Sequence, residues 1–284
     1  MTRVLLAVVL LLGTAAFARA QAPSAPAVTA SAPNTCVTCH AADANPRLSA
    51  PVTAHAGDVH ASRGLTCVDC HGGNASEPDK AKSMAASADF KGRSVGATCG
   101  SCHAMFATLF EQSSHTLVFE KACVDCHGSH AIAPASDALI GNDAGAICAT
   151  CHTEKDDPGF VGAGAMRAAL DRLSGGLAAA TTVVERARHA GMDVGDQDLL
   201  LGKARDQLML ARTEVHGFST TRVEAVTAEG DRAAAEAEAG GHRALEELSF
   251  RRRGLTASLV LILAVVAALT LKIRQIDRRR ERQV

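Results

Sequence analysis

All ten cysteines of this chain of 284 residues fall into one repeated pattern, C-x-x-C-H. Two thiols followed at once by a histidine attach a c-type haem, because the thiols form thioethers with the vinyl groups and the histidine binds the iron. Five copies predict five covalently attached haem c groups. The copies are numbered along the chain: motif 1 is Cys36, Cys39 and His40; motif 2 is Cys67, Cys70 and His71; motif 3 is Cys99, Cys102 and His103; motif 4 is Cys123, Cys126 and His127; motif 5 is Cys148, Cys151 and His152.

Two other uses of cysteine fit the pattern less well. Structural zinc sites combine two C-x-x-C pairs, or one pair with two histidines, and five pairs cannot be matched in twos. A disulfide framework suits an exported chain, but it gives no reason for a histidine after every second cysteine. Haem attachment accounts for every residue of the pattern.

The segment that carries the motifs, residues 35–160, is too poor in apolar residues for an ordinary core. Roughly one residue in six there is Leu, Ile, Val, Met or Phe. Successive motifs begin 31, 32, 24 and 25 residues apart. Such a loose repeat, interrupted by Pro and Gly, predicts a mainly α, loop-rich domain with little or no β structure, in which porphyrins supply the apolar interior. The net charge of −1 gives no indication of nucleic-acid binding.

The two ends of the chain are expected to carry a signal peptide and a membrane anchor. Residues 1–20 resemble a secretory signal peptide, with Arg3, an apolar run and the small-residue site Ala18-Arg19-Ala20. The alternative is an uncleaved anchor, for which the run is short. Residues 21–34, rich in Ala, Pro and Ser, are expected to be a flexible linker. Residues 254–272 predict one transmembrane helix, and the basic residues 273–284 predict a cytoplasmic tail.

Residues 161–253 show two apolar stripes at helical spacing, one from Leu170 to Gly191 and one from Leu201 to Phe218. They predict a long antiparallel helical hairpin with a turn near Gly195. We expect its second helix to continue towards the membrane past a soft point at Gly240-Gly241. The narrow seam would also suit a homo-oligomer.

Seven histidines outside the motifs are candidates for the second axial position on iron. A second protein ligand gives an electron carrier, and an open position permits substrate chemistry. We expect His189 and His242 to be solvated surface residues and Met166 to be a packing residue. The candidate distal ligands are His55, His60, His115, His130 and His216. His130 follows motif 4 too closely to reach the iron of that motif. His216 lies at the end of the hairpin nearest the haem domain.

The stretches Asp58–Gly73 (DVHASRGLTCVDCHGG) and Ser114–His152 (with CVDCHGSHAI and ICATCH) resemble the bacterial multihaem c-type cytochromes of respiratory chains, in particular their tetrahaem and pentahaem members. The resemblance covers roughly the middle half of the chain. It implies stacked, low-spin, bis-histidine haems that pass electrons in a line, with His60, His115 and His130 as distal ligands. The quinol-oxidising members have an N-terminal anchor, whereas this chain has its anchor at the C-terminus, which argues against direct quinol oxidation.

The function expected from these features is electron transfer between respiratory redox partners by a pentahaem cytochrome held in the inner membrane with its haem domain in the periplasm. The partners would be periplasmic or membrane redox proteins, with the quinol pool acting indirectly. The alternative is a multihaem reductase or oxidase of a small nitrogen or sulfur species, which needs one open-faced haem. The resemblance favours the carrier, because every motif ends in His and the chain has no Tyr. Nitrite reductases often carry C-x-x-C-K, and hydroxylamine oxidoreductases use a cross-linked Tyr.

Overall fold

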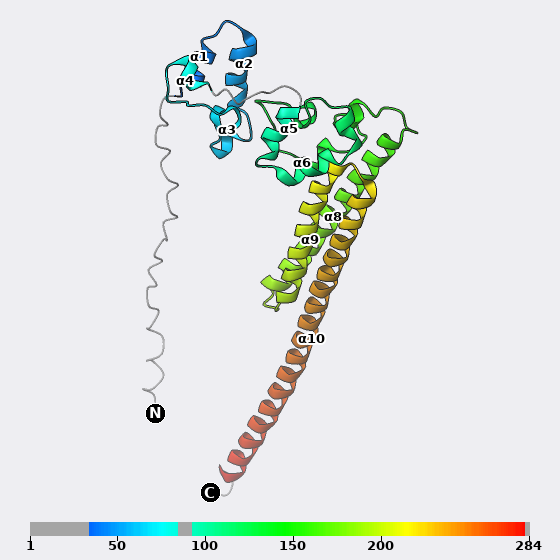
Figure 1. Cartoon of the computed structure of the whole chain (residues 1–284). Coiled ribbons are helices and arrows are strands. Elements are labelled where there is room, and N and C mark those ends of the chain that lie inside the picture. The colour runs from blue at the N-terminus through cyan, green and yellow to red at the C-terminus, as the bar shows by residue number, and fades with distance from the viewer. Residues whose placement is uncertain (1–33, 85–92, 282–284) are drawn as a thin grey trace.

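The computed structural model describes residues 34–84 and 93–281, which form a head on one end of a long helical stalk (Figure 1). The predicted signal peptide and nearly all of the predicted linker lie outside the described residues. No strand occurs among the described residues, so the predicted mainly α, loop-rich class is confirmed.

The head consists of short helices joined by loops. They are α1 (Thr35–Ala41), α2 (Pro46–His55), η1 (Ala61–Arg63), α3 (Cys67–His71), α4 (Lys80–Ser83), α5 (Arg93–Gly100), α6 (Ala104–Glu111), η2 (Ser114–Leu117), α7 (Cys123–His127), η3 (Asp137–Leu139) and η4 (Cys148–Thr150). Their apolar core is small. The buried hydrophobic side chains described in the head are Val95, Leu109, Ala122 and Ala146, whereas the stalk buries many more.

The same local rules shape α3 and α7, which share the sequence CVDCH. The aspartate in the first turn holds the chain that enters each helix: Asp69 accepts a hydrogen bond from the N–H of the N-cap Thr66, and Asp125 accepts one from the Lys121 N–H, just before α7. A glycine follows each motif histidine with φ of 67° and 72°, a left-handed conformation that glycine adopts without strain. The histidine therefore ends its helix, and the chain turns away at once.

Three helices form the stalk: α8 (Pro158–His189), α9 (Gly195–Glu214) and α10 (Thr220–Glu281), with the short turn η5 (Val215–Gly217) before α10. α8 leaves the head, α9 returns to it and α10 leaves again (Figure 1). Two apolar clusters join all three helices, one around Leu170 and Leu173 and one around Val184 and Leu201. The predicted seam is thus buried within a single chain.

The expected continuation of the second helix towards the membrane is wrong, because α9 ends at Glu214. A third helix, α10, extends towards the apolar end instead. Gly240 and Gly241 are not a soft point either. A Cβ at Gly240 would lie 2.6 Å from the Gln197 Nε2, and one at Gly241 would lie 2.9 Å from the Val183 Cγ1. These glycines let α10 pack closely on α8 and α9.

The far end of α10 extends beyond the other two helices. Its most apolar window has a mean hydropathy of 2.5, and none of that window is buried in the protein. Among the described residues this is the one helix long and apolar enough to cross a membrane. The predicted span, residues 254–272, lies within α10.

Candidate functional site

The five motifs lie on the short elements of the head. Motif 1 is in α1, motif 2 forms α3, motif 3 runs from the end of α5 to His103, motif 4 forms α7, and motif 5 begins in η4, next to the start of α8. All ten thiols are free, and none is joined in a disulfide. Among the described residues, no three or more His, Cys, Asp or Glu side chains are grouped so that they could hold a metal ion by themselves.

Thiols of consecutive motifs interact with each other. The interacting pairs are Cys36 with Cys67, Cys70 with Cys102, Cys99 with Cys123, and Cys126 with Cys148. The contact between motifs 3 and 4 is a hydrogen bond, which lowers the pKa of Cys123 to about 7 and raises the pKa of Cys99. The motifs are therefore neighbours in space in the order 1, 2, 3, 4, 5.

Four motif histidines each face one histidine from outside the motifs. The pairs, with the distance between ring centroids, are His71 and His130 at 5.7 Å, His60 and His103 at 6.0 Å, His127 and His216 at 6.1 Å, and His115 and His152 at 6.2 Å. Each pair joins segments well separated in the sequence, and the last two motifs draw on η2 and on the stalk turn η5.

The spacing of these pairs suits one metal ion between two imidazoles. With a metal–nitrogen bond of about 2.0 Å and a further ~1 Å to each ring centre, opposed ligands place their centroids about 6 Å apart. The Nε2 atoms of His71 and His130 are 3.4 Å apart, somewhat closer than the ~4 Å that two such bonds require. Four of the five candidate distal ligands therefore lie at ligand-pair distance from a motif histidine.

The fifth candidate, His55, is placed differently. It ends α2, which packs on α1 and hence beside motif 1. Its Nε2 lies 3.1 Å from the Leu65 carbonyl oxygen. His189 and His242 are exposed on the stalk, each 3.9 Å from a glutamate one turn earlier, and Met166 is buried in the stalk core.

Strained backbone is confined to the surroundings of these pairs. Three described residues other than glycine have positive φ: Ala122 at 50°, His130 at 58° and Phe218 at 50°. Ala122 precedes motif 4, His130 faces His71, and Phe218 stacks on His115 with centroids 3.8 Å apart. Because such conformations persist only where the surroundings impose them, the strain marks places where side-chain direction matters.

Two aspartates accept hydrogen bonds from the Nδ1 of histidines in these pairs. Asp58 is buried and accepts hydrogen bonds from the His60 ring Nδ1 at 2.9 Å and from the Ile132 N–H at 2.8 Å. Burial raises the pKa of Asp58, but the hydrogen bonds outweigh it and the pKa is lowered. Asp157 accepts from the His152 Nδ1 at 2.5 Å and from the Gly159 N–H at 3.0 Å, and these bonds lower its pKa.

Sequence reasoning missed four of these residues: Asp58, Asp157, Phe106 and Phe218. Phe106 lies edge-on to His216 at 4.8 Å. The short spacing Asp58-Val-His60 is the one local signal that points to a carboxylate behind a candidate ligand. Phe218 ends the second apolar stripe, and that pattern gives no sign of its contact with His115.

The residues present fit covalently attached haem. A cavity of about 620 Å³ adjoins Cys123, lined by Phe110, Val118 and Phe119 among others, and its size is that of a cofactor pocket. The His115 Nδ1 is buried, and no described group hydrogen-bonds to it. The opposed histidines, free thiols and sparse apolar core are explained together by a planar, apolar group between the rings.

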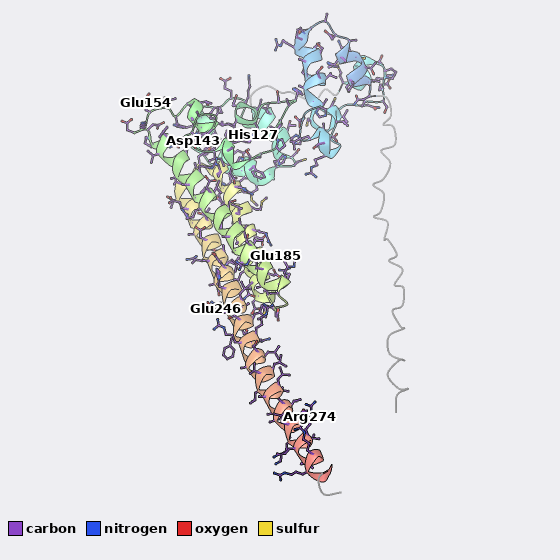
Figure 2. All side chains as sticks on the ribbon, turned by 180° about the vertical axis from the view of Figure 1, so that it is seen from behind. His127, Asp143, Glu154, Glu185, Glu246 and Arg274 are labelled. Atoms are coloured by element: carbon purple, nitrogen blue, oxygen red, sulfur yellow. The ribbon has the colours of Figure 1, made fainter. Side chains whose placement is uncertain are left out.

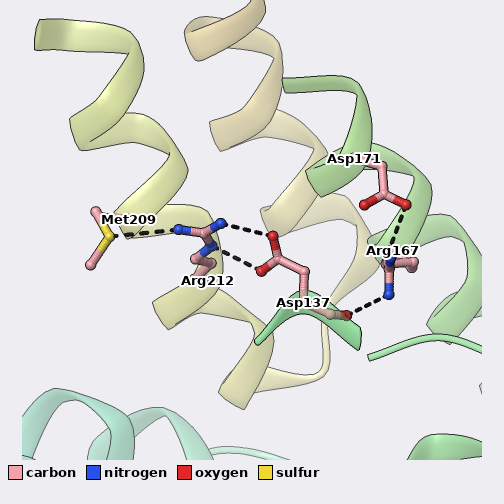
Figure 3. Close-up of polar contacts among 5 residues, drawn as sticks. All are labelled: Asp137, Arg167, Asp171, Met209 and Arg212. Atoms are coloured by element: carbon pink, nitrogen blue, oxygen red, sulfur yellow. Dashed lines mark hydrogen bonds and ion pairs between the residues drawn. The ribbon is translucent and has the colours of Figure 1, made fainter. Parts of the chain in front are cut away.

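The head is fastened to the stalk by charged side chains (Figure 3). Both oxygens of Asp137, in η3, accept hydrogen bonds of 2.8 Å from the Arg212 guanidinium of α9. Arg167 of α8 donates to the Asp137 carbonyl at 2.8 Å and pairs with Asp171. The bond to Asp137 raises the pKa of Arg212. Arg212 lies about one helical turn before His216, so this contact fixes the height of the turn that faces motif 4.

Residues 59–153 match the family model of cytochrome c3. The match supports a multihaem c-type cytochrome that transfers electrons and carries covalently bound haem c. It covers motifs 2 to 5, whereas motif 1 lies before it. No curated protein and no solved structure matches the chain.

Replacing Arg212 with Lys removes the two-pronged bond to Asp137 and keeps the charge. We expect a loss of about 1–2 kcal/mol in the free energy of unfolding, measured by thermal denaturation of the full chain in detergent. The matched control is Arg172→Lys, because Arg172 pairs with Asp231 at 57% side-chain exposure and its loss should cost under about 0.5 kcal/mol. Equal effects of the two changes would contradict a special role for the Asp137 contact.

Proposed function

We propose that the chain is a membrane-anchored periplasmic pentahaem cytochrome that carries electrons between respiratory redox partners. The observation that supports this best is the set of four opposed histidine pairs, each with one member in a C-x-x-C-H motif. An iron closed on both faces by imidazole exchanges electrons without binding substrate. Closed irons in neighbouring motifs favour a carrier over an enzyme.

The proposed distal ligands follow from the pairs. His130 serves the iron of motif 2, His60 that of motif 3, His216 that of motif 4 and His115 that of motif 5. When bound, each haem would take up and release one electron and exchange it with its neighbours. The chain's own residues would hold the irons in the order of the motifs, and Phe106 and Phe218 pack against the proposed distal rings of His216 and His115, which limits the access of water.

The length of the stalk favours a redox partner that contacts the head far from the lipid. All five motifs lie at the end of the stalk opposite the apolar segment, and His127 and Arg274 mark the two ends in Figure 2. From Thr220 to Leu255 α10 spans 36 residues, which is roughly 50 Å at 1.5 Å per residue. We therefore propose protein redox partners at that height, with the quinol pool acting only through them.

A second function is favoured by one observation, the position of His55. Its Nε2 lies 3.1 Å from the Leu65 carbonyl oxygen, which competes with an iron for this nitrogen. If it stays there, the iron of motif 1 keeps one open position, as a reductase or oxidase of a small nitrogen or sulfur species would require. If His55 turns to this iron, all five are closed.

Replacing His216 with Ala should convert one haem to high spin, because it removes the distal imidazole from the iron of motif 4. The electron paramagnetic resonance spectrum of the oxidised protein would report this as a new high-spin signal of one haem. His189→Ala is the control, since His189 is 82% exposed on the stalk and should leave the spectrum unchanged. An unchanged spectrum in the His216 variant would remove this residue from the ligands.

The height of the head predicts that quinol in the bilayer cannot reduce the haems directly. The full-length haem protein in proteoliposomes loaded with a long-chain quinol should stay oxidised, while a water-soluble short-chain quinol reduces it. The soluble quinol controls for the chemistry, so a difference between the two reports distance. Equally fast reduction by both would show that the head reaches the membrane.

A further inference from the structure

The imidazoles of the proposed ligand pairs differ in what lies behind them. A histidine that binds metal through one nitrogen donates the other N–H to an acceptor, and that acceptor tunes the metal. Behind His152 and His60 the acceptors are the carboxylates of Asp157 and Asp58. Behind His216 it is the neutral carbonyl of Thr213, at 3.1 Å from the Nδ1.

The site around Asp157 is built so that His152 and the start of the stalk share one carboxylate. Asp157 caps α8: one oxygen accepts from the Gly159 N–H, and the other accepts from the His152 ring. The ring lies directly on the first turn of the helix, because a Cβ at position 159 would be 2.1 Å from the ring atoms Cε1 and Nδ1. Only glycine fits there without displacing the histidine.

We propose that Asp157 is a positioning residue that fixes the orientation of His152 and lowers the reduction potential of the haem of motif 5. This inference rests on the proposed function, in which His152 and His115 bind that iron. A carboxylate acceptor makes the imidazole a stronger donor to iron, and its negative charge favours Fe(III) over Fe(II). The reduction concerned is the addition of one electron to Fe(III), with no proton or bond change required.

The N-terminus of α8 would raise the reduction potential of the haem of motif 5, but its effect is weaker than that of Asp157. A helix N-terminus carries a partial charge equivalent to about +0.5, which favours Fe(II). The carboxylate carries a full negative charge and is bonded to the ligand itself, so the net effect is to stabilise Fe(III). Asp58 should act in the same way through His60 on the haem of motif 3. The haem of motif 4, whose distal histidine has a neutral acceptor, is then reduced before its two neighbours.

Asp157 offers a cleaner test than Asp58. Asparagine caps helices as well as aspartate does, so Asp157→Asn keeps the bond from Gly159 and removes the charge behind His152. Asp58 uses both oxygens in the fold, because one accepts from His60 and the other from Ile132. Asp157→Ser also retains capping without a charge and serves if the asparagine variant folds poorly.

The experiment is a spectroelectrochemical titration of the full-length haem protein. In Asp157→Asn or Asp157→Ser, one midpoint potential should rise so that its Fe(II)/Fe(III) ratio at fixed potential increases about tenfold, or 59 mV for one electron. The other potentials and the low-spin spectrum should stay as they are. The matched control is Asp79→Asn, because Asp79 caps α4 through the Ala81 and Lys82 N–H groups, and it should shift nothing.

A second variant separates this inference from the proposed function. His115→Ala should make the haem of motif 5 high spin. If it does and the Asp157 variants leave all potentials unchanged, Asp157 is only a helix cap and this inference is overturned. If His115→Ala leaves the spectrum unchanged, the proposed ligand pair itself is wrong. A shift of the same size in Asp79→Asn would show that the potentials respond to surface charge and not to the bond with His152.

Discussion

The head has little apolar core of its own, so the proposed histidine pairs would supply much of what holds it together. Four described hydrophobic side chains are buried in it, whereas the stalk has a continuous apolar seam. The histidine pairs connect segments that sequence separates widely, such as His71 with His130 and His127 with His216. With iron between the rings, each pair becomes a cross-link, and the porphyrin beside it supplies apolar surface that the chain lacks.

The stalk and the head meet where ligand geometry matters most. The turn η5 lies between the end of α9 and the start of α10, packs on α6 and brings His216 to the His127 ring of motif 4, and Phe218, which follows it, stacks on the His115 ring. The bond between Arg212 and Asp137 fixes the same turn from outside. The stalk core therefore fixes the position of His216, the proposed distal ligand of motif 4.

The motifs and the helical class could be predicted from the sequence because both depend on local spacing. Placing His216 near the head was also possible, since helix length sets its height. The third stalk helix was missed because an apolar stripe does not indicate where the chain reverses direction. The reversal before α10 depends on the left-handed backbone of Phe218. Asp157 was missed because capping and ligand orientation are shared by one side chain only after folding brings α8 to motif 5.

The most direct test of the paired-histidine account is the electron paramagnetic resonance spectrum of the oxidised full-length protein. The ring planes are nearly parallel in the pairs His71–His130 and His127–His216, at 8° and 19°, and nearly perpendicular in His60–His103 and His115–His152, at 75° and 71°. Parallel planes split the iron orbitals and give rhombic low-spin signals, whereas perpendicular planes give low-spin signals with a larger maximal g value. The account predicts two haems of each kind. High-spin signals from more than one haem, or a single low-spin class, would contradict it.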